Sequence, residues 1–343
     1  MAALASAPAA IAQAKADTLP SCNAWLENRI KGRSLSVDSL ALDRLRAAGA
    51  TIEPSRRMRA EGYPWEHYIR IALPPSYHRD AGRHFPVLWV TDGQFFFSLL
   101  AELVTSCAGK SLPEMIVVAI GATPEADQAK NEIQSQRSFD FGPNTISGYT
   151  GFGSAVHNER SEAAEKKLKA EGKFPNDRLG GAPRFLAFLM GDVRKQLGQD
   201  YRMADDHTLF GHSGSGLFCT YALLARPSSF TRYVCGSPSL AAGDYEVFRI
   251  EERLAQQNKD LVASVFFGAG EAEILAGNTW GIVSSTVRMA EILRMRAYPS
   301  LKLSARIFPG EGHGSVIPLV ISWGLRAVWE KDFRASAPSG SPQ

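Results

Sequence analysis

The chain has 343 residues, 45% hydrophobic and 21% charged, which is enough for a sizeable core and excludes a disordered or low-complexity protein. Lys and Arg total 38 against 35 Asp and Glu, and a net charge of +3 over this length is too small to indicate a nucleic-acid-binding protein. No apolar run approaches the ~18 residues of a membrane span. The four cysteines contain no C-x-x-C pair, which excludes a zinc ribbon and a thioredoxin-type motif.

The two ends of the chain differ in composition from its middle. Residues 1–20 are predicted to be a leader, because their Ala-rich start ends in an Ala-x-Ala pattern typical of a signal-peptide cleavage site. The basic segment that normally opens a signal peptide is missing, so a periplasmic or secreted protein and a cytoplasmic one both stay open. Residues 334–343 are Pro/Ser-rich and are predicted to be a flexible tail.

Hydrophobic patterns predict one α/β domain over residues 21–333, with an N-terminal extension at 21–65 and a long insertion at 144–180. Strands are predicted at 67–73, 86–90, 115–120, 208–210, 232–235, 262–267 and 303–308. Helices are predicted at 38–48, 95–106, 159–171, 184–197, 215–225, 244–257, 280–296 and 315–331. Apart from the helix at 159–171, the segment 121–182 is predicted to be loop. Short apolar strands alternating with helices indicate a mostly parallel sheet with helices on both faces.

One motif at a strand–helix junction carries chemistry. Residues 211–216 read Gly-His-Ser-Gly-Ser-Gly, which resembles the G-x-S-x-G turn that exposes a nucleophilic serine in α/β-hydrolases. The motif departs from the pattern at Ser215, where glycine is expected, but serine is small enough to let strand and helix approach. Ser213 is therefore the candidate nucleophile, and an ordinary Ser/Gly helix start is the alternative.

A serine nucleophile needs a base and an orienting acid, in this fold in the order Ser, acid, His. His313 is the only histidine after Ser213, and it lies in a glycine-flanked loop that follows the last predicted strand. Glu273 is the preferred acid and Glu271 the alternative, since both follow the strand at 262–267. The other six histidines have no metal-ligand spacing, so neither a metal nor a cofactor is predicted.

The sequence indicates the oxyanion hole and the substrate pocket less clearly than it indicates the nucleophile and the base. Backbone N–H groups of Gly214 and Gln94 are the candidate donors, and Asp92 is interpreted as a turn former. Trp280 is a candidate for the pocket rim, with simple packing as the alternative. Cys219 and Cys235 are predicted to be buried thiols rather than a disulfide, whereas Cys22 and Cys107 could pair in an exported protein.

Several segments together resemble a known family. They are 85–93 (FPVLWVTDG), 136–143 (QRSFDFGP), 180–186, 208–213 (TLFGHS), 237–239 (SPS), 269–273 and 312–316. Over residues 66–330 the chain resembles the esterase D-like branch of the α/β-hydrolases, which includes siderophore esterases of the enterochelin-esterase type. The resemblance implies Ser213, His313 and Glu273 as a triad, Gln94 and Gly214 at the oxyanion hole, and Arg137 near the substrate. Three features depart from the family pattern: Ser215, the lack of the tryptophans that often directly follow the turn at 237–239, and the long insertion.

These patterns predict a serine carboxylic-ester hydrolase that forms an acyl-enzyme on a small-molecule ester or lactone. An acyltransferase on the same scaffold would use the same acyl-enzyme, so the sequence does not separate the two. A binding protein that kept the fold without catalysis is the second alternative, although the intact Ser–acid–His order argues against it.

Overall fold

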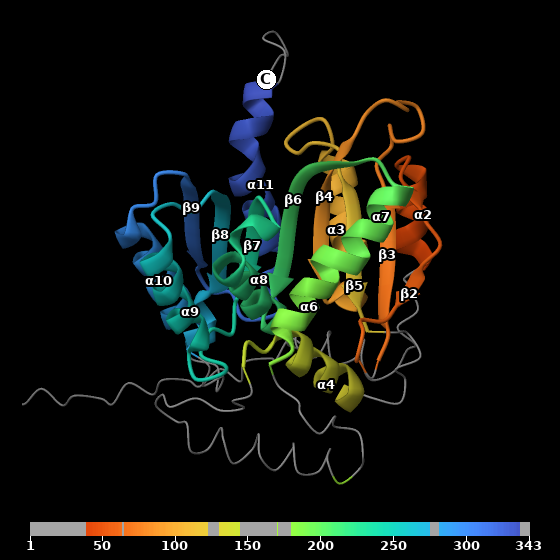
Figure 1. Cartoon of the computed structure of the whole chain (residues 1–343). Helices are drawn as coiled ribbons and strands as arrows, with labels where there is room; N and C mark the ends of the chain where they lie inside the picture. Colours follow the sequence, from red (N-terminus) through yellow and green to blue (C-terminus); the bar gives the residue numbers. More distant parts are fainter. Residues whose placement is uncertain are drawn as a thin grey trace, which may run out of the picture.

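A computed structural model describes residues 39–63, 65–122, 130–144, 170, 180–274 and 281–336. Within these residues, nine strands form one sheet in the order β1-β3-β5-β4-β6-β7-β8-β9, with β2 paired to β3 (Figure 1). The strands are β1 (Thr51–Ile52), β2 (Arg56–Met58), β3 (His67–Leu73), β4 (Phe85–Thr91), β5 (Ile116–Gly121), β6 (Met203–His212), β7 (Arg232–Gly236), β8 (Ala263–Gly270) and β9 (Leu301–Phe308). All pairings from β5 to β9 are parallel, and only β1, β2 and β3 run antiparallel to their neighbours. The predicted α/β class with a mostly parallel sheet is confirmed.

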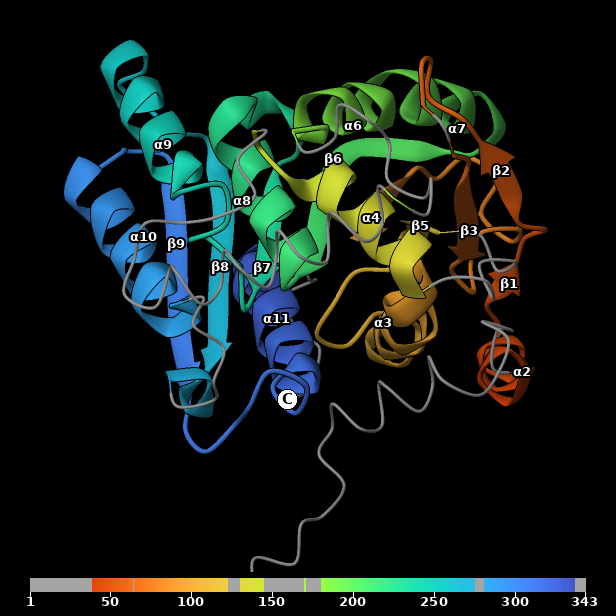
Figure 2. The same cartoon turned by 90° about the horizontal axis from the view of Figure 1, so that it is seen from below.

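Helices cover both faces of the sheet (Figure 2). The helices are α2 (Ser39–Ala47), α3 (Gly93–Cys107), α4 (Lys130–Phe141), α6 (Ala182–Phe188), α7 (Arg194–Asp200), α8 (Gly214–Ala225), α9 (Glu246–Gln257), α10 (Ile282–Arg296) and α11 (Ile317–Ser336). Helices α2, α3 and α11 lie on one face, and α6 to α10 lie on the other. No helix within the described ranges is both long and apolar enough to cross a membrane.

Strand β4 shows why the core divides into two layers. Its side chains are apolar on both faces, as expected for a central parallel strand. Successive side chains point to opposite faces, so Val87 and Trp89 enter the cluster under α8 while Leu88 and Val90 enter the cluster under α3 and α11. The carboxyl ends of the parallel strands meet at one edge, and α4 lies across that end of the sheet (Figure 1).

The structure differs from the predicted elements in three places. Residues 130–141 form helix α4 where a loop was predicted. The segment has too few apolar residues to show a helical pattern, and its contacts with other elements hold it in place. The helix predicted at 184–197 is interrupted by a π-helical turn at Leu189–Val193. The extension at 21–65 adds the short strands β1 and β2, which no hydrophobic pattern marks.

Some predictions concern residues outside those that the structure describes. They are the leader at 1–20, Cys22, the helix at 159–171, most of the insertion at 144–180, Trp280 and the end of the tail. The predicted domain boundaries therefore remain predictions.

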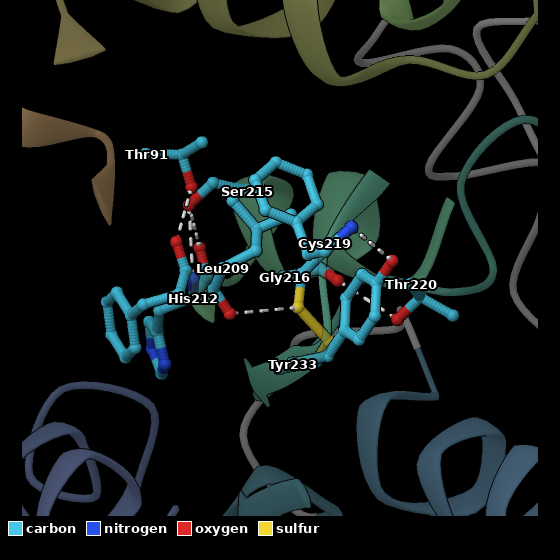
Figure 3. The surroundings of a disulfide bond; sticks show 11 residues. Thr91, Leu209, His212, Ser215, Gly216, Cys219, Thr220 and Tyr233 are labelled. Carbon is cyan, nitrogen blue, oxygen red and sulfur yellow. Dashed lines mark hydrogen bonds between the residues drawn. A yellow bond between two sulfur atoms is a disulfide. The ribbon is translucent and has the colours of Figure 1, made fainter. Parts of the chain in front are cut away.

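Cys219 and Cys235 form a disulfide, so the prediction of two buried thiols was wrong about their chemistry and right about their burial (Figure 3). Their Cα atoms are 5.6 Å apart, because α8 packs directly on β7, and this separation suits a disulfide. The bond lies one helical turn beyond Ser215 and joins the nucleophile helix to the neighbouring strand. Among the described cysteines, Cys107 is free.

Candidate active site

Ser213 occupies a strained turn between β6 and α8. Its φ of 63° and ψ of −120° lie in a region that L-residues rarely adopt, at a cost on the order of 1–3 kcal/mol. His212 ends β6 and Gly214 begins α8, so the serine stands alone at the junction. This is the geometry that a G-x-S-x-G turn produces, with the hydroxyl clear of the backbone.

The small residues around Ser213 are required by close backbone contacts. A Cβ on Gly211 would lie 2.0 Å from the Ser215 carbonyl oxygen, and one on Gly216 would lie 2.5 Å from the Gly236 carbonyl oxygen. Ser215, the departure from the motif, is fully buried. Its hydroxyl donates to the His212 carbonyl at 2.9 Å and accepts from the His212 N–H at 3.0 Å. The serine at this position therefore adds two hydrogen bonds that brace the turn.

Three side chains from three strand ends form a continuous line of hydrogen bonds. The Ser213 hydroxyl lies 2.9 Å from Nε2 of His313, and Nδ1 of His313 lies 2.8 Å from Oε2 of Glu273. Because a carboxylate only accepts, Nδ1 of His313 carries the proton and its Nε2 is free to accept from the serine. His313 follows β9, and Glu273 lies in the 3₁₀ turn after β8.

The structure separates the two glutamates that the sequence left as alternatives. Glu273 is buried, and its Oε1 accepts from the Ser237 hydroxyl at 2.6 Å and from the Gly270 N–H at 2.7 Å. Glu271 is exposed and accepts from the Gly310 N–H at 2.9 Å. Gly310 has a φ of 72° in the loop that leads to His313, so Glu271 supports the shape of this loop. Only Glu273 reaches the imidazole.

The two predicted oxyanion donors lie at the first turns of two helices. Gly214 is the first residue of α8 and Gln94 is the second residue of α3, where backbone N–H groups have no partner within the helix. The Gln94 side chain accepts from the Ala122 N–H and donates to Asp92, each at 3.2 Å. These bonds fix the start of α3 against the ends of β4 and β5.

An ion pair between a buried carboxylate and a partly buried guanidinium lies beside these donors, and it was not predicted from the sequence. Arg137 of α4 binds Asp92 with both Nε and Nη2, at 2.7 and 2.9 Å, and Asp92 is 1% exposed. Burial favours the neutral guanidinium, but the charge and hydrogen bonds of Asp92 outweigh it and raise the pKa of Arg137. Its Nη2 lies 3.6 Å from the position of a Cβ on Gly214. Asp92 is thus an ion-pair partner as well as a turn former.

A small pocket lies next to Gln94 and Arg137 and extends to a buried pair that joins β3 to α4. His67 Nε2 lies 2.9 Å from Oδ2 of Asp140, and both side chains are almost fully buried. Burial raises the pKa of the Asp140 carboxyl, against the opposing influence of His67. Helix α4 is therefore attached to the sheet by two polar pairs. In the ranges given above, no group of three or more His, Cys, Asp or Glu side chains could hold a metal ion.

A family model and two curated relatives that match this chain are all described as esterases. The model of the "Putative esterase" family matches residues 61–287. Ferri-bacillibactin esterase BesA of Bacillus subtilis is 29% identical over 276 residues, which cover 78% of this chain and 86% of that protein. Siderophore enterobactin esterase of Emericella nidulans is 30% identical over 287 residues, covering 76% and 88%.

Solved structures share the fold. BES protein from Bacillus cereus superposes with a TM-score of 0.62 at 25% identity, covering 81% of this chain and 96% of that one. Siderophore hydrolase EstA from Aspergillus nidulans has a TM-score of 0.65 at 19% identity, covering 85% and 96%. The α/β-hydrolase fold expected from the sequence is thereby confirmed.

Proposed function

The chain belongs to the "Putative esterase" family and is a carboxylic-ester hydrolase, and on that premise we propose that Ser213, His313 and Glu273 cleave the ester through an acyl-enzyme. The observation that carries the proposal is the continuous line of hydrogen bonds from the Ser213 hydroxyl to the Glu273 carboxylate. A hydroxyl, an imidazole and a carboxylate in that order are the parts of a serine nucleophile with its base and orienting acid.

In the first half-reaction, Nε2 of His313 accepts the Ser213 proton while Oγ attacks the ester carbonyl carbon. The negative charge that develops on the carbonyl oxygen is stabilised by the N–H groups of Gly214 and Gln94. Glu273 stabilises the imidazolium, which then gives its proton to the departing alcohol. Water, deprotonated by His313, releases the acid from Ser213 in the second half-reaction.

For the substrate, we propose a siderophore-like ester or lactone. The support is that two relatives similar over more than three quarters of this chain are named for the esters of siderophores.

The test combines covalent labelling with product analysis. A fluorophosphonate probe should label the wild-type protein at Ser213, and Ser213→Ala should not be labelled. The wild-type protein should hydrolyse a macrocyclic lactone siderophore faster than p-nitrophenyl esters of simple acids. With an added alcohol acceptor, free acid should remain the product. Absence of labelling would overturn the mechanism, a transferred acyl group would point to an acyltransferase, and inert siderophores would remove the substrate proposal alone.

We also propose that the protein works in an oxidising compartment, the periplasm or the extracellular space. The support is the disulfide between Cys219 and Cys235, since disulfides rarely persist in a cytosol kept reduced. Mass mapping of the bond in protein taken from its native compartment tests this. Two free thiols there would favour a cytoplasmic protein.

A further inference from the structure

His212 is a buried imidazole directly before the nucleophile, and the mechanism above gives it no role. It is 3% exposed, and its ring centroid lies 4.8 Å from that of His313. Its Nε2 lies 3.0 Å from the backbone carbonyl oxygen of His313. Because a carbonyl only accepts, Nε2 of His212 carries the proton and donates it to this oxygen.

The His212 ring is neutral and enclosed. Burial lowers its pKa well below 6.5, and the neighbouring His313 and Arg137 act in the same direction, while the bond to the His313 carbonyl acts against them. Its Nδ1 is buried without a hydrogen-bond partner. A Cβ on Gly236 would lie 2.8 Å from this atom, so glycine at that position leaves room for the ring. These contacts keep the His212 ring in a single neutral tautomer, whose Nε2–H points at the backbone of the loop that carries His313.

The backbone of His212 is held as firmly as its side chain. Ser215 binds both the N–H and the carbonyl of His212 through one hydroxyl. Residue 212 is therefore fixed by the turn that also shapes Ser213. A single residue connects the strained nucleophile to the backbone of the base through one peptide link and one hydrogen bond.

We propose that His212 is a positioning residue, which ties the loop after β9 to the end of β6 and thereby sets the distance between the His313 base and the Ser213 nucleophile. The inference rests on the proposed function, because positioning has a meaning only if these two residues react. The glutamate on the other side of the imidazole fixes its Nδ1, and the bond from His212 fixes the backbone that carries it. Misplacement of a reacting group by about 1 Å can cost on the order of 10² in rate.

The test compares His212→Leu, which fills similar space without a donor, with His212→Gln, whose amide N–H can reach the same carbonyl. We expect Leu to lower kcat about 10- to 100-fold with little change in KM, and Gln to recover most of the loss. If the Leu variant does not fold, His212→Asn takes its place, since its shorter amide does not reach the carbonyl. Equal activity of the Gln and Leu or Asn variants would overturn the proposal.

The pH profile gives a readout that loss of packing alone would not move. The titratable groups around the base are Glu273 in contact with Nδ1, Glu271 at Gly310, Glu311 on the same loop, Arg137 from α4 and His212 itself. Without the His212 bond the base sits less firmly against Glu273, and the pH dependence of kcat/KM reports on that contact. The acid limb of kcat/KM should therefore move in the Leu variant and stay in place in the Gln variant.

His207→Gln is the matched control. His207 is a second buried histidine of β6, five residues before His212, and it accepts from the Trp89 indole N–H at 3.0 Å. Its replacement should lower the melting temperature while leaving kcat and the acid limb unchanged. Fluorophosphonate labelling of the wild-type protein distinguishes failure of the positioning proposal from failure of the proposed mechanism. A labelled wild type with a normal His212→Leu variant removes only the positioning role, whereas an unlabelled wild type removes the proposed mechanism.

Discussion

The two sides of the candidate active site are built by different means. On the side of Ser213, His313 and Glu273, residues at the ends of β6, β8 and β9 are joined by short hydrogen bonds, many of them to the backbone. On the oxyanion side, the start of α3 is held by side chains of α4, a polar helix that crosses the end of the sheet. The first side depends on strand order and tight turns, whereas the second depends on two buried polar pairs. Substitutions should therefore act mainly on turnover on one side, and on both turnover and stability on the other.

The largest effect is expected from Ser213→Ala. Loss of a triad nucleophile typically costs ~10⁴–10⁶ in kcat. The hydroxyl contributes to the hydrogen-bond line and not to the core, so thermal unfolding should stay near that of the wild type. Ester hydrolysis and a melting curve on the same preparation measure both. Near-wild-type turnover would place the nucleophile elsewhere.

Glu273→Gln and Glu271→Gln sharpen the comparison within one side. The amide cannot stabilise the imidazolium, so Glu273→Gln should lower kcat by ~10⁴, as an Asp→Asn change does in an analogous triad on an unrelated fold. Glu271→Gln is the matched control two residues away, and it should cost less than about tenfold, because its exposed carboxylate acts only through screened electrostatics and one bond to the loop. A reversed ranking would assign the acid to Glu271.

Arg137→Met tests the oxyanion side. The change leaves the Asp92 carboxylate buried without its cation, which typically destabilises by about 3–5 kcal/mol. The start of α3 should shift with Asp92, and loss of one oxyanion donor costs about 10²–10³ in kcat. Adding Asp92→Asn removes the unpaired charge and should restore stability more than turnover. If Arg137→Met alters KM alone, Arg137 contacts substrate and does not support the donors.

Removal of the disulfide between α8 and β7 tests how much this bond stabilises the helix that follows Ser213. Cys219→Ala with Cys235→Ala opens a loop with a sequence separation of 16, which should cost about 3 kcal/mol in the free energy of unfolding. Denaturant unfolding measures this, and Cys107→Ala serves as the control with an expected change within about 0.5 kcal/mol. Mild reductant should not affect folded wild-type activity, because both sulfurs are fully buried. Rapid inactivation by reductant would contradict this burial.

The smallest effect concerns pH and the pair that holds α4. Since burial raises the pKa of Asp140, the folded protein keeps a proton that the unfolded chain releases above its ordinary carboxyl pKa of ~3.9. The contribution of Asp140 to stability is therefore full at low pH and falls as pH rises towards the raised pKa. Asp140→Asn cannot titrate, so its melting temperature relative to wild type should increase with pH over this range. A constant difference between the two proteins would contradict the raised pKa.

Local patterns were sufficient for most of the fold. The strands from β3 to β9 and the helices that alternate with them were predictable, because their apolar runs and helical spacings are strong. Helix α4 was not, since its polar residues carry no apolar stripe and its helical form depends on contacts such as Arg137 with Asp92. Strands β1 and β2 are too short for any periodicity to appear.

The candidate catalytic residues divide in the same way. The sequence by itself determined Ser213 and His313 as candidates, because the small residues around the serine and the order of the chain follow from covalent geometry and fold class. Only the tertiary structure placed Glu273, and not Glu271, against His313, joined Cys219 to Cys235, and brought Arg137 to Asp92 and His212 to the loop after β9. Those contacts join segments far apart in the chain, and their existence depends on side-chain direction and distances of a few ångströms, which no spacing along a sequence contains.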